Sequence, residues 1–321
     1  MADVPAANYN VTITRLTSSK GSAVRKLQRF VPLYLLFLPV LTYYLIFAYA
    51  PMAGVIIAFK NYNFLDGIWG SSWAGLKHFE RFWTSGEFWN VLNNTIVLAL
   101  YRIIFGFPAP IILALLLYEL RFTRFTKLIQ TISYLPHFIS WVVVYALVYN
   151  FFASDGLINK LLVELGEASI PFMGDPKYFR TMFTGSAIWK EIGWGAIIYL
   201  AALTRVDTDL YEAASIDGAN RWHRLWHITL PGIRSIVSIM FVLSLGGILS
   251  VSFEQVLVMM NPMVTDVAEV LDYYIYRIGL LDINNQSYAT AIGLFRSLLA
   301  LILVIIANFV AKKIDEDGGI W

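Results

Sequence analysis

The stretch Arg205–Pro231 reads RVDTDLYEAASIDGANRWHRLWHITLP and separates two long apolar runs in the second half of the chain. Asp209 is a favoured N-cap for a short helix through 212–214, because aspartate accepts from free backbone N–H groups and alanine is the best helix former. Gly218 allows a left-handed turn, after which a second amphipathic helix runs to Pro231, where the next helix would begin. The stretch therefore predicts two short, exposed helices joined at a glycine.

The composition of the chain is typical of a protein that lies in lipid. Of the 321 residues, 58% are hydrophobic and 14% charged, and mean hydropathy is +0.63. A hydrocarbon core about 30 Å thick needs about 20 helical residues, and continuously apolar runs favour helices over barrel strands. The sequence predicts an all-α membrane protein with six transmembrane helices at 31–50, 94–118, 129–152, 182–204, 233–260 and 288–311.

Composition also excludes several classes of protein. The formal net charge of +2 gives no basic surface for nucleic acid. The chain has no cysteine, which excludes disulfides, thiolate metal sites and cysteine nucleophiles. His223 and His227 have the spacing of a helical zinc pair, but Arg224 takes the place of a catalytic Glu and no third ligand is near, so no metal site is predicted. His137 is expected to bond a neighbouring group rather than a substrate.

The charge distribution predicts the orientation. With the N-terminus inside, the inner segments hold 14 Lys and Arg and the outer segments seven, and the positive-inside rule then places both termini in the cytoplasm. The predicted organisation is listed in chain order: a cytoplasmic N-terminal segment 1–30, the first span with an outer surface segment 31–93, a core 94–311 with the polar loop 205–232, and a cytoplasmic tail 312–321. In the outer segment, Trp and Phe predict short amphipathic helices at the membrane surface.

The polar loop resembles the EAA loop of ABC-importer permeases, whose pattern is EAAxxDGAxxxxxFxxIxLP. The matching positions are Glu212, Ala213, Ala214, Asp217, Gly218, Ala219, Ile228, Leu230 and Pro231. The chain departs from the pattern at one position, where Trp226 replaces Phe. In that family the loop forms coupling helices that fit into a groove of the cytoplasmic ATPase, which implies the type I importer permease fold.

Further motifs narrow the resemblance. Residues 105–110, 134–141 and 288–295 look like the polysaccharide-type permeases of the carbohydrate-uptake branch, and the whole chain is most similar to permease subunits of bacterial importers for alginate oligosaccharides. The resemblance implies an inner-membrane complex with a second permease, two ATPase subunits and a periplasmic solute-binding protein. It also implies import of an oligosaccharide, with an anionic one expected.

The chain carries no phosphate-binding loop of its own. The nearest pattern, from Gly185 to Lys190, lacks the second glycine that cradles nucleotide phosphates. We therefore expect a non-catalytic permease with no cofactor, and ATP and Mg²⁺ in the partner ATPase.

Charged residues inside the predicted spans are candidates for the substrate path, because ionisable groups are costly in lipid. They fall in one layer, roughly 9–14 Å below the outer boundary at 1.5 Å per residue. The candidates are Arg102, Lys190, Glu191, Glu254 and Arg296, with Trp194 and Phe253 as aromatic residues that could stack on sugar rings. The cations could bind carboxylates. Alternatively, the charges pair with one another, Lys190 snorkels to the surface, and the aromatic residues pack against lipid or helices.

Of two other classes of protein, the first remains an alternative and the second is excluded. A proton-coupled secondary transporter could use Glu191 and Glu254 as relays, although it would normally show matching interrupted helices in two repeats, and none is apparent. An intramembrane hydrolase lacks a coherent nucleophile and base.

Overall fold

The computed structural model describes residues 20–120, 123–249, 253–282 and 284–314, so residues 1–19 and 315–321 of the predicted cytoplasmic ends lie outside it. The chain divides into two units, 1–54 and 55–321, and each is described by itself.

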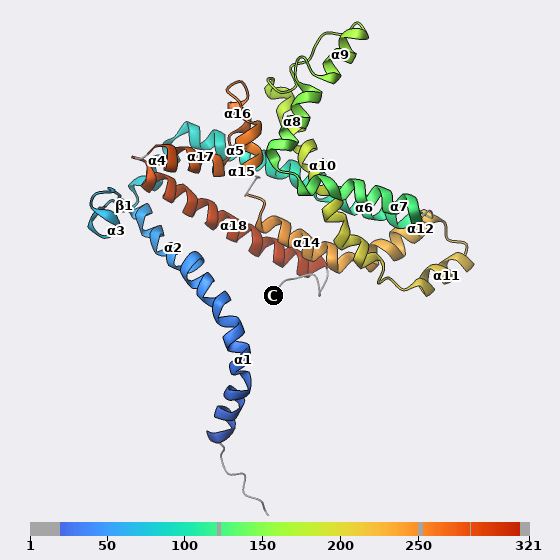
Figure 1. Ribbon diagram of the computed structural model, residues 1–321, viewed down its shortest axis with the longest axis horizontal. Helices are drawn as coiled ribbons and strands as arrows, with labels where there is room; N and C mark the ends of the chain where they lie inside the picture. The colour runs from blue at the N-terminus through green and yellow to red at the C-terminus, as the bar shows by residue number, and fades with distance from the viewer. Residues whose placement is uncertain (1–19, 121–122, 250–252, 283, 315–321) are drawn as a thin grey trace, which may run out of the picture. The chain divides into compact units, whose positions relative to one another are not determined.

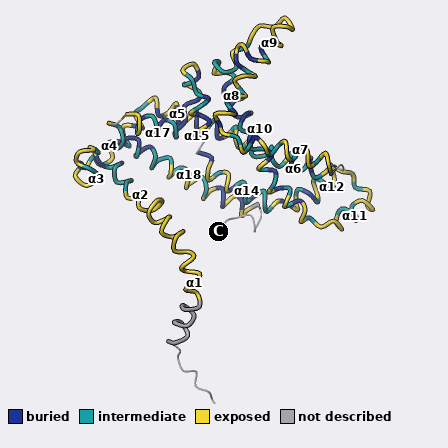
Figure 2. Tube along the Cα trace, in the orientation of Figure 1, coloured by how far each residue is buried: buried dark blue, intermediate teal, exposed yellow. Residues whose placement is uncertain are grey.

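The first unit is one long apolar helix. Its elements are α1 (Lys20–Tyr44), a π-helical turn η1 (Leu45–Tyr49) and α2 (Ala50–Met52). Every side chain described from Phe30 to Met52 is exposed within this chain, as the trace of α1 and α2 in Figure 2 shows. A helix that is apolar on all sides requires lipid or a partner around it, and Phe30–Phe59 is a candidate membrane span with a mean hydropathy of 2.0.

The second unit begins with a small hairpin. Its elements are η2 (Ala53–Phe59, a 3-10 helix that crosses the unit boundary), β1 (Lys60–Asn61), α3 (Gly67–Gly70), β2 (Ser72–Trp73) and α4 (Lys77–Thr84). β1 and β2 pair antiparallel, with Lys60 opposite Trp73. The short helices predicted for the outer segment are present.

Helices make up the rest of the second unit. The first group is α5 (Gly86–Tyr101), π-turn η3 (Arg102–Gly106), α6 (Pro108–Glu119), α7 (Thr123–Tyr134), 3-10 helix η4 (Leu135–Phe138), α8 (Trp141–Phe152), α9 (Leu157–Glu164) and α10 (Pro176–Leu203). The second is α11 (Thr208–Ile216), α12 (Arg221–Arg224), π-turn η5 (Leu225–Thr229), α13 (Leu230–Gly232) and α14 (Arg234–Gly246). The last is α15 (Phe253–Met259), α16 (Thr265–Ala268), α17 (Leu271–Tyr276), π-turn η6 (Arg277–Leu281) and α18 (Gln286–Ile314). Figure 1 shows their arrangement.

The predicted spans are confirmed only in part. Within the described residues, four helices are long and apolar enough to cross a membrane, and the bent pair Arg221–Gly232 and Arg234–Gly246 would make a fifth. The count of six is therefore not directly confirmed.

Two spans predicted as continuous are broken. The predicted span 129–152 is interrupted between η4 and α8, because Pro136 has no N–H and Ile139 and Ser140 are extended, with Ser140 capping α8. The predicted span 233–260 also fails as a single helix, since α14 ends at Gly246, before a second glycine that weakens helical structure further.

The helix α10 is the centre of the second unit. Ala196, Tyr199 and Leu203 on α10 are buried together with Ala114 of α6. On another side, α10 and α7 meet backbone to backbone at Gly193, where a Cβ would lie 2.1 Å from the carbonyl oxygen of Ser133. Only glycine fits at such an approach. This contact fixes α7 and η4 against the middle of α10, beside Lys190 and Glu191.

Candidate functional site

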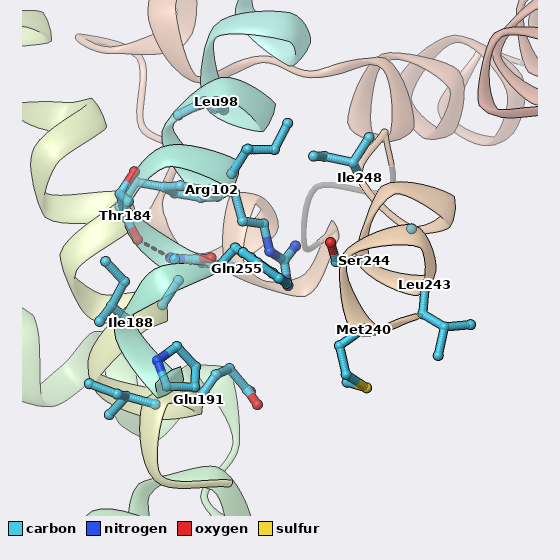
Figure 3. A pocket seen from close by; sticks show the side chains of 18 of the residues that line it. Leu98, Arg102, Thr184, Ile188, Glu191, Met240, Leu243, Ser244, Ile248 and Gln255 are labelled. Atoms are coloured by element: carbon cyan, nitrogen blue, oxygen red, sulfur yellow. Dashed lines mark hydrogen bonds between the residues drawn. The ribbon is translucent and has the colours of Figure 1, made fainter. Parts of the chain in front are cut away.

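A cavity of about 370 Å³ opens between α5, η3, α6, α10, α14 and α15. Its size is within the range of small-molecule sites. Its polar lining includes Arg102, Thr184, Glu191, Ser244 and Gln255, with apolar side chains such as Leu98, Ile188 and Met240 between them (Figure 3). The cavity therefore joins three regions that are far apart in the sequence, α5 to α6, α10, and α14 to α15.

Arg102 is the cation of this cavity. It begins the π-helical turn η3, in which the carbonyl of Arg102 accepts from the N–H of Phe107. In the close-up its side chain extends into the cavity on the side of Ser244 (Figure 3). Within the described ranges Arg102 forms no salt bridge within 4 Å, and the acid that interacts with it electrostatically is Glu191. π-turns are frequent at functional sites, and this one presents a guanidinium to the cavity.

The acid of the cavity, Glu191, is already held by neighbours. Its Oε2 lies 2.8 Å from Nδ1 of His137, and its Oε1 lies 3.8 Å from Nζ of Lys190. The His137 ring stacks on Trp194 at 4.5 Å between centroids. The expectation that His137 bonds a neighbour is confirmed. The alternative that the charges of the spans pair with one another holds for Glu191 and Lys190, and Glu191 also attracts Arg102 electrostatically.

Lys190 does not snorkel, so that expectation is wrong. The residue is 6% exposed, and its Nζ donates to the carbonyl oxygens of His137 at 2.6 Å and Pro136 at 3.4 Å. The break after η4 leaves the carbonyl of His137 without a helical donor, whereas that of Pro136 also accepts from the N–H of Ile139 at 3.3 Å. Lys190 thus ties the broken segment to α10 and does not line the cavity.

Arg296 and Glu254 lie apart from the cavity lining. Arg296 forms an ion pair with Asp272, with 2.6 Å between Nε and Oδ1, and this is a structural contact between α18 and α17. Asp272 lies outside the predicted spans, so the layer of charged residues predicted from the sequence does not include it. Glu254 is exposed on α15, while its neighbour Gln255 faces the cavity.

The aromatic candidates do not line the cavity either. Trp194 is 45% exposed and stacks on His137. Phe253 packs against Tyr273 and Tyr276, at 6.5 and 5.2 Å between ring centroids. Packing against neighbours was the alternative given for these residues.

Gln255 is a site residue that sequence analysis overlooked. It is 1% exposed, and its Nε2 donates to the carbonyl oxygen of Phe183 at 2.7 Å and to Oγ of Ser186 at 3.1 Å. An amide inside an apolar span is itself a signal, since a buried polar group needs partners. Glu254 is a candidate because it is charged, but the buried residue is its uncharged neighbour Gln255.

The polar loop forms the two predicted helices, α11 and α12. Its N-cap is Asp207 and not Asp209, because the side chain of Asp207 accepts from the N–H of Asp209 at 3.0 Å. Gly218 has φ +76°, and the N–H of Ala219 donates to the carbonyl of Ala214 at 2.8 Å. This is a Schellman motif, which requires a left-handed residue at the position of Gly218.

Hydrogen bonds then fix the second helix against the first. Nη1 of Arg224 donates to Oγ of Ser215 at 3.0 Å, and the hydroxyls of Tyr211 and Thr229 lie 3.0 Å apart. Ile216, Trp222 and Trp226 remain exposed, by 87%, 69% and 63%. We call α11 and α12–η5–α13, residues 208–232, the coupling segment, after the family loop that it resembles. It presents large apolar side chains.

No group of three or more His, Asp or Glu residues that could hold a metal occurs within the described ranges. His223 and His227 stack at 5.9 Å between ring centroids, without a third ligand.

Comparison with known proteins identifies the family. Residues 106–316 match the family described as "Binding-protein-dependent transport system inner membrane component". The chain belongs to this family of ABC transporter permeases. The match includes the coupling segment and the cavity residues from Gly106 onward, but not Arg102, and it identifies the chain as a transmembrane transport component.

Curated relatives extend the match over the whole permease. Protein LplB of Bacillus subtilis (strain 168) is 47% identical over 305 residues, which cover 94% of this chain and 96% of that protein. The polygalacturonan/rhamnogalacturonan transport system permease protein YteP of the same organism is 43% identical over 318 residues, or 99% and 98% of the two chains.

Solved structures confirm the fold of the permease. A chain of a bacterial ABC transporter involved in the import of the acidic polysaccharide alginate has a TM-score of 0.85 and 38% identity, covering 92% of this chain and 99% of that one. A chain of the bacterial alginate ABC transporter in complex with an alginate pentasaccharide-bound periplasmic protein has a TM-score of 0.84 and 38% identity, covering 90% and 97%. The predicted ABC importer permease fold is thus confirmed.

Proposed function

We propose that this chain is a transmembrane subunit of an ATP-driven importer that takes an anionic oligosaccharide of the alginate type from a periplasmic binding protein across the inner membrane. The names of YteP and of the solved alginate transporter support the substrate class, since one carries polygalacturonan and rhamnogalacturonan and the other an acidic polysaccharide. A chain this similar over nearly its whole length is expected to handle a related sugar.

The position of Arg102 in the cavity is the observation that supports an anionic substrate. Arg102 lines the cavity and forms no salt bridge within 4 Å in the described ranges, while Glu191, the acid that attracts it electrostatically, already contacts His137. A guanidinium binds a carboxylate with two parallel, charge-assisted hydrogen bonds. The cavity is therefore suited to one uronate carboxylate.

The other partners follow from the same proposal. The coupling segment, with Glu212, Ala213, Ala214, Asp217, Gly218, Ala219, Leu230 and Pro231, binds the ATPase, which supplies ATP and Mg²⁺. The full complex contains a second permease, two ATPase subunits and the binding protein. Both termini are cytoplasmic, so a single cysteine at Asp217 should react with an impermeant reagent only from the cytoplasmic side.

The test of the function is uptake by the assembled complex in proteoliposomes. Arg102→Gln should lower uptake of a uronate oligosaccharide by about 10- to 100-fold, because a hydrogen bond to a charged group contributes about 1.5–3 kcal/mol, with an unchanged yield of complex. Arg296→Gln is the matched control, since it breaks the ion pair with Asp272 and should lower the yield and uptake together. Equal uptake by the wild type and Arg102→Gln, or uptake driven by a pH gradient without ATP, would contradict the proposal.

A further inference from the structure

The hairpin formed by residues 60–73, which we call the 60–73 hairpin, exposes a group of large apolar side chains. Phe64 is 76% exposed, Leu65 90% and Trp69 81%. Three such residues on one short loop form an apolar patch, and contiguous apolar patches mark sites of membrane or protein interaction. The family assignment does not account for them.

The interior of the hairpin is polar and satisfied by its own groups. Lys60 is 9% exposed, and its Nζ donates to the carbonyl oxygens of Ile68 at 2.8 Å and Trp69 at 3.1 Å. The carbonyl of Lys60 itself lies 3.0 Å from Nε2 of His78. The only lysine of the hairpin therefore points inward as a structural bridge.

The tip is fixed in the same way. The Ser71 hydroxyl donates to the carbonyl of Gly67 at 2.6 Å and accepts from the N–H of Asn63 at 3.0 Å. The Asn63 side chain accepts from the N–H of Leu65 and donates to Asp66. Backbone groups entering a lipid environment must be satisfied internally, and these bonds provide that for the residues around the exposed patch.

Contacts with α18 place the hairpin at the end of a candidate span. The N–H of Tyr62 donates to Oγ of Ser287 at 2.9 Å. Arg81 belongs to α4, the next helix after the hairpin in the chain. It donates to Oδ1 of Asn285 at 2.7 Å, and its guanidinium stacks on the Tyr288 ring at 4.1 Å from the centroid. Since Gln286–Lys313 is a candidate membrane span, the hairpin lies where that helix reaches the membrane boundary.

The position of the hairpin in the chain is a second, independent argument that it lies near the bilayer surface. The candidate span Phe30–Phe59 ends one residue before the hairpin begins. An extended chain covers at most about 3.6 Å per residue, so Phe64 lies within about 18 Å of Phe59. Both neighbouring spans thus hold the exposed patch near the bilayer surface.

Charge then distinguishes lipid from protein as the occupant. Between residues 61 and 76 the only Asp, Glu, Lys or Arg is Asp66, which accepts from Asn63. A protein partner is typically met by an apolar centre with a polar rim, whereas Trp and Phe on an uncharged surface are typical of the bilayer interface.

We propose that the 60–73 hairpin anchors the chain to the bilayer by inserting Phe64, Leu65 and Trp69 into the leaflet at the N-terminal end of α18. The anchor holds α4 and the start of α18 at a constant depth, because Tyr62 and Arg81 join the hairpin segment to the first turn of that helix. The occupant is the interfacial region of the lipid itself.

The chain has no cysteine, so single nitroxide labels at Leu65→Cys and Trp69→Cys test the proposal in the complete complex in nanodiscs. The matched control is Met263→Cys, because Met263 is 70% exposed, much like Phe64, and belongs neither to a candidate span nor to the coupling segment. Collision with oxygen, which concentrates in lipid, is compared with collision with a nickel chelate, which stays in water. Labels at 65 and 69 should report a depth of about 5–10 Å, and the label at 263 should not contact lipid.

Three outcomes would overturn the proposal. Labels at 65 and 69 that collide with the nickel chelate as freely as an aqueous reference would place the patch in water. Labels that lose collisions with both reagents when the purified solute-binding protein is added would make the patch a protein-docking surface. Oxygen collisions at 263 equal to those at 65 would show that exposure alone, and not insertion, determines the signal.

Discussion

The 60–73 hairpin and the coupling segment are built by similar means but differ in charge. Each turns at a glycine with positive φ, +65° at Gly67 and +76° at Gly218, and each satisfies its own polar groups while exposing large apolar side chains. Between residues 207 and 224, however, six residues are Asp, Glu or Arg, against one between residues 61 and 76. The comparison teaches that apolar exposure alone does not reveal the partner, and that the charges between the apolar side chains distinguish protein from lipid.

The largest expected effect is that of Gly218→Pro in the coupling segment. Proline fixes φ near −65°, whereas the Schellman turn needs φ +76°, so α11 and α12 should lose their mutual orientation. We expect the ATPase to detach or to lose its sugar-stimulated activity, with normal membrane insertion. Co-purification of the ATPase and its rate of hydrolysis with sugar would measure this.

The control for this change is the corresponding glycine of the hairpin. Gly67→Pro should leave ATPase binding unaffected, because the hairpin has no part in that contact. If Gly218→Pro couples normally, or if Gly67→Pro detaches the ATPase, the division of roles between the two regions is wrong.

A smaller effect is expected for Lys60→Met. The change leaves the carbonyls of Ile68 and Trp69 without their donor, and an unsatisfied buried acceptor costs about 1–3 kcal/mol. The hairpin should open locally and become sensitive to protease added on the outer side, while sugar-stimulated hydrolysis persists. The exposed Lys77→Met serves as control, and equal protease resistance of the two variants would show that the buried amine does not hold the hairpin.

A still smaller effect is expected for Arg224→Ala. This change removes the bond between α12 and Ser215 of α11, and an exposed or partly exposed hydrogen bond contributes about 0.5–1.5 kcal/mol. Affinity for the ATPase should fall by about 2- to 10-fold, as titration of the ATPase against the permease complex would measure. Arg221→Ala, which removes a neighbouring exposed cation, should change affinity less, and a reversed order would assign the effect to net charge.

The smallest effect concerns pH. Burial lowers the pKa of His78 below its ordinary 6.5, the bond to the Lys60 carbonyl opposes this, and the cations of Lys77 and Arg81 lower it further. A group with a lowered pKa binds fewer protons when folded, so its contribution to stability is complete above pH 6.5 and is lost as the pH falls below it. Hydrogen exchange of the 60–73 amides, corrected for intrinsic rates, should accelerate between pH 7.5 and 5.5, and His78→Gln should remove this dependence.

Sequence analysis predicts the local structure where the signal is local. The two coupling helices and the turn at Gly218 follow from caps, alanines and a glycine. The cap itself was misassigned, because Asp207 and Asp209 are both acceptable N-caps and only the backbone geometry selects between them.

The tertiary contacts of the charged residues could not be predicted from the sequence. Lys190 is held by the carbonyls of Pro136 and His137, next to the break after η4, and Arg296 pairs with an acid outside the predicted spans. The π-turn at Arg102 adds a residue to the helical repeat, so the faces of 94–118 cannot be read with one period. Such features depend on the path of the backbone rather than on residue type.

The length of α10 has a mechanical consequence. This uninterrupted helix of 28 residues carries Glu191 at the cavity and ends at Leu203, five residues before α11 begins at Thr208. From Glu191 to Leu203 the helix measures about 18 Å at 1.5 Å per residue, and a tilt of about 5° at the cavity displaces its far end by about 1.6 Å. The helix thus acts as a lever, in which a small adjustment around a bound sugar becomes a displacement of atomic size at the start of the coupling segment.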